Sequence, residues 1–165
     1  MRMILAGAAL TVALAAPAHA TVNVSIDLAT QRMHVESAAG TYDWPVSTAR
    51  EGYVTPTGTF TPERLMEVYR SKKYDNAPMP HAIFFYYGFA IHGTNEVRHL
   101  GQPASHGCVR LAPANAGKLF ALVKAEGASI TITGVPSWAP PGYSAAVASA
   151  APASKGGGLF TFLGF

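Results

Sequence analysis

The chain has little charge and a single cysteine. Cys108 has no partner within the 165 residues, which excludes the small scaffolds held together by intramolecular disulfides. Charged residues make up 13% of the chain, with 12 basic and 9 acidic side chains, and no run of like charge is longer than Lys72-Lys73. A dedicated nucleic-acid binder has a much denser basic face. The length predicts one domain, large enough to bury a core without covalent cross-links.

A membrane-spanning hydrophobic run is also lacking. The apolar stretch at 4–16 is too short to cross a bilayer, but it follows the basic start Met1-Arg2-Met3 and precedes Ala18-His19-Ala20, which has the form of a cleavage site. We therefore expect residues 1–20 to be a secretory signal peptide rather than an N-terminal helix of the fold. An exported protein meets oxidising conditions, where a lone thiol is a liability unless it is buried or used for chemistry.

Hydrophobic patterning predicts a mostly-β (α+β) domain over residues 21–136 with one main helix. The helix is expected at 113–126, because Pro113 opens it, its apolar residues share one face and Gly127 ends it. Alternating or β-branched and aromatic runs predict strands at 21–28, 31–37, 41–47, 81–87, 89–92 and 130–133. We expect the aromatic run 84–87 to pack in the core and across strands. Residues 59–70 fit neither the helical nor the strand period. We expect loops at 71–80 and 95–105. We expect 137–165 to be a flexible tail, because it is rich in Pro, Ala, Ser and Gly.

The residues that carry chemistry are His92, at the end of a predicted strand, and the segment Ser105-His106-Gly107-Cys108. A cysteine nucleophile needs a base, a lowered pKa and donors for the oxyanion. We expect His92 to supply the base, the amides of Gly107 and Cys108 to meet at one oxygen, and two histidines with Arg110 to favour the thiolate.

Two other chemistries are less favoured. Because His92 precedes Cys108, the order is opposite to that of papain-like peptidases. A zinc site would use His92, His106 and Cys108 with His81 or His99, but it lacks paired ligand spacing and has few acids nearby, Asp75 and Glu96.

This motif resembles the catalytic domain of the L,D-transpeptidases of bacterial peptidoglycan. His92 and Ser105-His106-Gly107-Cys108 fill that family's hallmark, and segments 55–60, 74–80 and 113–116 are also similar, so the resemblance covers roughly residues 22–134. It implies a β-sandwich-like mixed sheet with the site under a flap, and it favours strand for residues 59–70.

The resemblance also implies the roles of individual residues. Cys108 would be the nucleophile and His92 its base, oriented by the backbone carbonyl of Gly93. The backbone amides of His106, Gly107 and Cys108 would line the oxyanion hole, and Tyr74 would lie over it. Ser105 and Arg110 would complete the residues that meet the oxyanion or the substrate. Arg110 would bind a substrate carboxylate through its two-pronged guanidinium.

The implied reaction needs no metal and no organic cofactor. Cys108 would attack the carbonyl between the diamino acid at stem position 3 and the terminal D-Ala, release D-Ala and form a thioester. An amine would then take the acyl group, giving a 3→3 cross-link, while a protein amine, a free D-amino acid or water are alternative acceptors. We expect a monomer in the periplasm or cell envelope that acts on peptidoglycan stem peptides. The alternatives are another envelope thiol amidase and a non-catalytic peptidoglycan-binding module.

Overall fold

The structure, a computed structural model, describes residues 21–143. Its first sheet has the order β3-β2-β1-β11-β4, with β1 (Val22–Asp27) parallel to β11 (Ala128–Thr133). Strand alternation buries every second side chain of β1, beginning with Val22 and Val24. The other members are β2 (Arg32–Ser37), β3 (Gly40–Pro45) and β4 (Gly58–Phe60).

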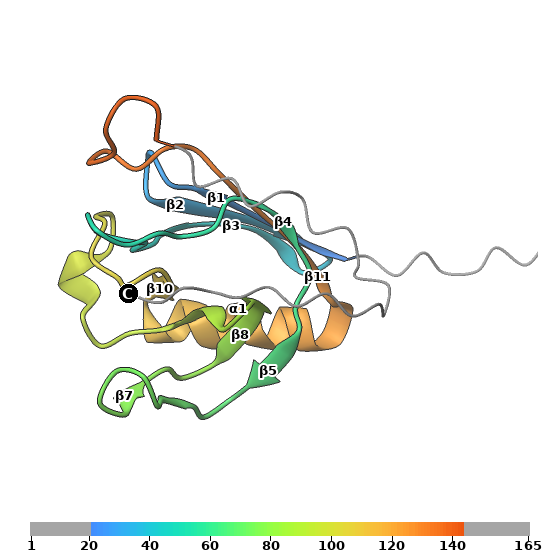
Figure 1. Ribbon diagram of the computed structural model, residues 1–165. Coiled ribbons are helices and arrows are strands. Elements are labelled where there is room, and N and C mark those ends of the chain that lie inside the picture. The colour runs from blue at the N-terminus through green and yellow to red at the C-terminus, as the bar shows by residue number, and fades with distance from the viewer. Residues whose placement is uncertain (1–20, 144–165) are drawn as a thin grey trace, which may run out of the picture.

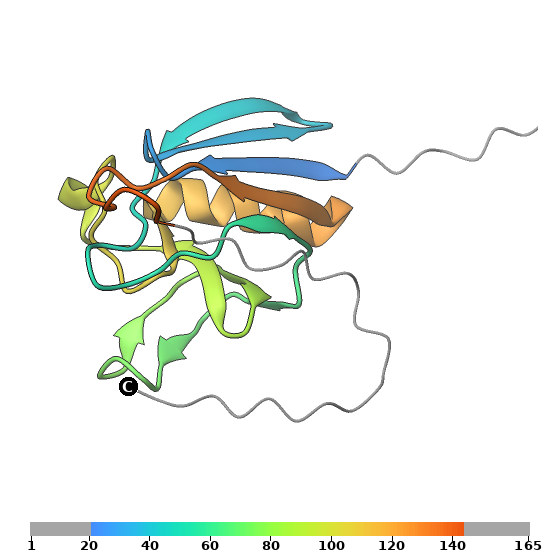
Figure 2. The ribbon, with the colours of Figure 1, turned by 45° about the horizontal axis from the view of Figure 1, so that its top comes forward.

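A second, four-stranded sheet has the order β10-β9-β8-β5. Its strands are β5 (Arg64–Met66), β8 (Ala82–Tyr86), β9 (Phe89–Gly93) and β10 (Val109–Leu111). Helix α1 (Pro113–Glu126) follows β10, and its buried face consists of Ala116, Leu119, Phe120 and Val123. The two sheets and this helix share one hydrophobic core (Figures 1 and 2).

Two small elements flank the second sheet. The two-stranded ribbon of β6 (Arg70–Ser71) and β7 (Ala77–Pro78) projects at the lower left of Figure 1. The 3₁₀ helix η1 (Val97–His99) interrupts the long connection between β9 and β10. No helix among residues 21–143 is both long enough and apolar enough to span a membrane.

The fold class and the helix at 113–126 are confirmed. The predicted loop at 71–80 is partly wrong, because it contains the short strand β7. No element was predicted at 109–111, where β10 follows Cys108 directly. The ambiguous stretch 59–70 contains strand, as the resemblance favoured. In the aromatic run, Phe84 and Phe85 are buried, but Tyr87 lies at a hairpin tip and is 86% exposed, so its predicted packing is wrong.

Two sequence predictions fall at the ends of the described residues. The proposed signal peptide, residues 1–20, lies outside them, as do residues 144–165 of the predicted tail. At the start of that tail, the Trp138 indole Nε1 donates a hydrogen bond to the Ala49 carbonyl at 2.8 Å. The chain after β11 therefore returns to the domain at Trp138.

Candidate active site

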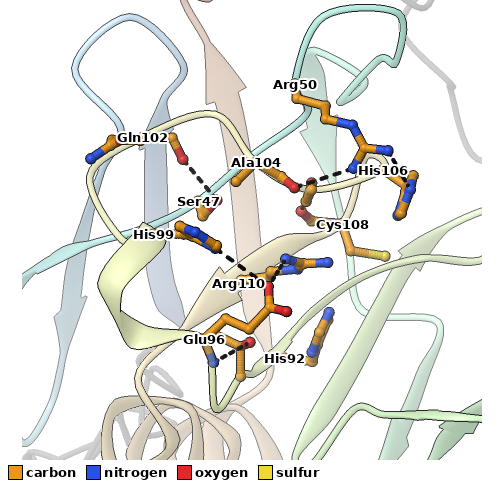
Figure 3. Close-up of polar contacts among 12 residues, drawn as sticks. Ser47, Arg50, His92, Glu96, His99, Gln102, Ala104, His106, Cys108 and Arg110 are labelled. Carbon is orange, nitrogen blue, oxygen red and sulfur yellow. Dashed lines mark hydrogen bonds and ion pairs between the residues drawn. The ribbon is translucent and has the colours of Figure 1, made fainter.

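Parallel pairing of β9 and β10 places the predicted catalytic residues together. The register sets Val109 beside Ile91 and Arg110 beside His92. Because side chains alternate along a strand, Val109 and Ile91 enter the core while Arg110 and His92 face the other way, and Cys108, two residues before Arg110, shares their face. All three line a cleft of about 310 Å³, the first cleft, and face the same space in Figure 3.

His92 is held as a neutral base. Its Nδ1 lies 2.7 Å from the Gly93 carbonyl oxygen, and since a carbonyl only accepts, Nδ1 carries the proton and Nε2 has the free lone pair. Burial lowers the pKa of His92 to about 4, against the raising effect of this hydrogen bond and with a smaller lowering effect from Arg110. A side chain on Gly93 would press on Pro80 and on Ala116, at 3.1 and 3.3 Å from its Cβ, so glycine lets β9 approach its neighbours closely here.

The environment of Cys108 does not favour the thiolate, contrary to the sequence-based expectation. Burial raises the pKa of the Cys108 thiol, and the opposing effects of the Ala90 backbone and of Arg110 are smaller. The expectation was wrong because it assigned positive charge to two histidines, whereas burial lowers the pKa of His92 and also that of His106. In the free protein the thiol of Cys108 and the imidazole of His92 are therefore both neutral.

The turn before Cys108 is fixed by two buried hydroxyl groups. Ser105 Oγ accepts a hydrogen bond from the Gly107 amide at 2.9 Å and donates one to the Cys108 carbonyl at 2.7 Å. Thr55 Oγ1 donates to the Gly107 carbonyl at 2.9 Å and accepts from the Ala49 amide at 3.0 Å. The Gly107 amide is thus engaged, and of the three amides expected at the oxyanion hole, only those of His106 and Cys108 have no acceptor within residues 21–143.

Glycine is required at position 107 for two reasons. Its φ of +126° is a conformation that L side chains rarely adopt. A Cβ there would also lie 2.5 Å from Phe89 Cε1 and 2.6 Å from the Val54 carbonyl oxygen. The chain can therefore pass under Phe89 and present Cys108 only with glycine before it.

His106 forms a wall of the site rather than a second base. Its Nε2 lies 2.8 Å from an Arg50 guanidinium nitrogen, and because arginine only donates, Nε2 accepts. The ring stacks on Tyr74 with centroids 4.5 Å apart and meets Tyr53 edge-on at 4.6 Å. Burial lowers the pKa of His106, as do, to a lesser extent, Arg50, Arg110 and Lys73. Tyr74 therefore lines the first cleft directly and packs against His106 there.

Arg110 enters the first cleft already paired. One guanidinium nitrogen lies 3.0 Å from a Glu96 carboxylate oxygen, and His99 Nδ1 lies 3.5 Å from the same oxygen (Figure 3).

Residues 21–143 contain no group of three His, Cys, Asp or Glu side chains that could hold a metal ion, so this geometry gives the zinc alternative no support. Sequence reasoning named Arg110 but assigned no role to Arg50, Thr55 or Glu96.

A second cleft, of about 320 Å³, also reaches Cys108. It shares Tyr74, Met79 and His106 with the first cleft, but His92 lines only the first. The second cleft is bordered by Arg64, Lys72 and Lys73. Cys108 thus lies where two differently charged clefts meet.

Comparison with known proteins agrees with this geometry. Residues 21–137 match the family model described as YkuD, L,D-transpeptidase catalytic domain. None of the curated proteins matches the chain significantly.

Solved structures similar to this chain are L,D-transpeptidases. One from Stackebrandtia nassauensis has a TM-score of 0.63 and 27% identity over 71% of this chain and 57% of its own. An L,D-transpeptidase from Mycobacterium smegmatis has a TM-score of 0.61 and 24% identity, and the match covers 69% of this chain and 59% of its own. L,D-transpeptidase 3 from Mycobacterium tuberculosis, in complex with a faropenem-derived adduct, has a TM-score of 0.61 and 17% identity. That match covers 69% of this chain and 60% of its own. This chain therefore spans less than two thirds of each of these proteins.

Proposed function

This chain belongs to the L,D-transpeptidase catalytic domain family, and from that premise we propose that it transfers the acyl part of a peptidoglycan stem tetrapeptide to an amine through a thioester on Cys108. The observation that carries the proposal is the placement of Cys108 and His92 on one face of adjacent parallel strands, in one cleft. The apolar leader and Ala18-His19-Ala20 add the proposal that the enzyme acts after export, in the periplasm or cell envelope.

In the first half-reaction, Cys108 Sγ attacks the carbonyl carbon between the diamino acid and the terminal D-Ala. Because thiol and imidazole both start neutral, the Sγ proton passes to His92 Nε2 as the S–C bond forms. The Gly93 carbonyl, on the opposite ring nitrogen, stabilises the imidazolium. The amides of His106 and Cys108 receive the oxyanion. His92 then protonates the D-Ala nitrogen, the C–N bond breaks and the thioester remains.

The second half-reaction reverses these proton transfers. An acceptor amine attacks the thioester carbonyl, His92 Nε2 takes a proton from the amine nitrogen, and Cys108 Sγ leaves and recovers that proton. The new amide is a 3→3 cross-link when the amine belongs to the diamino acid of another stem. A protein amine, a free D-amino acid or water would follow the same route, and water would make the enzyme an L,D-carboxypeptidase.

Muropeptide analysis by mass spectrometry tests the reaction, because it reports cleavage position and acceptor together. Incubated with a purified disaccharide-tetrapeptide, the wild type should release D-Ala and form a dimer. Cys108→Ala should form neither product and should unfold at nearly the same temperature, because its side chain is smaller by one sulfur atom only. Cleavage at another stem bond would indicate a thiol amidase, and turnover by Cys108→Ala would refute the thioester.

A β-lactam gives a second readout of the same nucleophile. One solved relative carries a faropenem-derived adduct, and a strained β-lactam amide resembles the attacked stem carbonyl. Intact-mass spectrometry after incubation with a carbapenem should show a single adduct on the wild type and none on Cys108→Ala. A wild type that stays unmodified while iodoacetamide still labels Cys108 would contradict the proposed acyl pocket.

A further inference from the structure

The second cleft carries positive charge that no residue of the described chain neutralises. Arg64, Lys72 and Lys73 border it, no acidic residue lines it, and no carboxylate within residues 21–143 forms an ion pair with any of the three. In the first cleft, by contrast, Arg110 already has Glu96 as its partner. The two clefts that meet at Cys108 therefore differ in charge.

Beneath these cations the second cleft is aromatic. The Arg64 guanidinium lies over the Phe84 ring, 4.2 Å from its centroid, and Lys73 Nζ lies 5.5 Å from the centroid of Tyr74. Tyr87, 86% exposed, forms part of the rim. These cation–π contacts do not neutralise the positive charges, so a ligand carboxylate can still pair with them. The aromatic rings also give the apolar parts of the ligand a surface to pack on.

The position of His92 indicates which half of the substrate each cleft holds. The departing amine receives a proton from His92 and the attacking amine gives one to it, so both nitrogens must lie near the same imidazole. His92 lines the first cleft and not the second. The amine side of the reaction is therefore assigned to the first cleft, and the second cleft, which Cys108 also lines, is left for the acyl chain.

We propose that the second cleft binds the acyl half of the donor and selects peptides that carry free carboxylates along that half, through Arg64, Lys72 and Lys73. This rests on the proposed function, since it assumes a peptide thioester on Cys108. It narrows the donor from any stem tetrapeptide to one whose acyl half itself carries free carboxylates.

The test compares two donor tetrapeptides that differ only in whether the carboxylates of the acyl half are free or amidated. Lys72→Gln/Lys73→Gln removes two exposed charges from the loop between β6 and β7. Lys118→Gln/Lys124→Gln, on α1 and outside both clefts, is the matched control for net charge. Acylation of Cys108 is followed by intact mass at low salt, and donor affinity is measured by calorimetry with each pair of substitutions on a Cys108→Ala background.

With the free-carboxylate donor, Lys72→Gln/Lys73→Gln should lower both the acylation rate and the donor affinity roughly fivefold, as expected for the loss of two exposed charge pairs. Both losses should shrink as salt is added. The effect of this variant on the amidated donor should be no larger than that of the α1 control. Alkylation of Cys108 by iodoacetamide, which is neutral, should not change.

Two results would overturn the inference. One is an equal loss for both donors, and the other is an equal loss in the α1 control. Turnover without charge selectivity would leave the proposed function standing and remove this inference alone. Charge-selective affinity in the Cys108→Ala background without any thioester in the wild type would refute the proposed function and leave a charge-selective peptide-binding cleft without the acyl transfer.

Discussion

His92 and Cys108 show how burial, rather than neighbouring charge, determines the protonation of a reacting pair. Both histidines near the thiol have pKa values below the usual range, and the thiol pKa is raised. The sequence placed Cys108 and His92 correctly in one site because the motif holds them at a family-typical spacing. It could not give their charge, since burial depends on elements far away in the chain.

The pH dependence of acylation should report this neutral pair. Below the His92 pKa of about 4 the imidazolium cannot accept the Sγ proton, so the acylation rate should fall as the pH drops through about 4 and stay level above it until the thiol ionises. Carbapenem adduct formation, followed by intact mass, measures the rate, and circular dichroism checks folding at each pH. An inflection near the ordinary histidine pKa of about 6.5 would show that His92 is not the buried base described here.

Arg110 should contribute to substrate binding without being essential. Loss of one charge-assisted contact costs about 1.5–3 kcal/mol, so Arg110→Ala should slow acylation by roughly ten- to a hundredfold and not abolish it. Glu96→Gln, which keeps an oxygen acceptor for the guanidinium but removes the charge, is the matched variant and should have a smaller effect. Wild-type rates in Arg110→Ala would exclude a contact between Arg110 and the substrate.

At the scale of elements, the site depends on a clamp between the segment before β4 and the turn before β10. Thr55 is fully buried, and its hydroxyl connects the Ala49 amide to the Gly107 carbonyl. Arg50 from the same segment holds His106. Sequence reasoning noted segment 55–60 as similar to the family but gave it no role, because hydrogen bonds across 52 positions leave no local pattern.

Thr55→Val should destabilise the domain and slow acylation together. It leaves a buried amide and a buried carbonyl without partners, at a cost of about 1–3 kcal/mol. Thr59→Val, on an exposed position of β4, removes a hydroxyl without burying an unpaired group and serves as control. Urea unfolding and adduct formation measure the two effects, and a Thr55→Val protein as stable and as fast as the control would contradict the clamp.

Elements with a long regular pattern were predicted well, and short ones were not. The alternation in 21–28 and the helical face of 113–126 are local signals that tertiary contacts reinforce. β10 has three residues and β6 only two, too few to show a period. The parallel pairing of β1 with β11, and hence the central place of β11 in its sheet, joins residues about a hundred positions apart and follows only from packing.

In the whole molecule, one strand serves both stability and chemistry. β9 lies between β8 and β10, sends Ile91 into the shared core and turns His92 to the first cleft, while α1 packs against it. The match over residues 21–137 confirms the family inferred from the motif. The mixed sheets with one main helix confirm the fold class inferred from patterning. Because the base sits on such a strand, its titration should affect the stability of the whole domain.

Acid should therefore unfold this domain partly through His92. Its folded-state pKa of about 4 lies below the unfolded value of 6.5, so between these values the unfolded chain binds more protons, and the free energy of unfolding falls as pH decreases. Over that window the loss is about 3 kcal/mol. Burial also lowers the pKa of His106, which adds to the loss of stability in acid, whereas Asp43 raises the pKa of exposed His34, which reduces that loss.

Urea unfolding at about pH 7 and about pH 4.5 should show a smaller pH dependence for His92→Gln than for the wild type or for a His34→Gln control. Equal pH dependence in all three proteins would mean that His92 is not held neutral by burial in the folded domain.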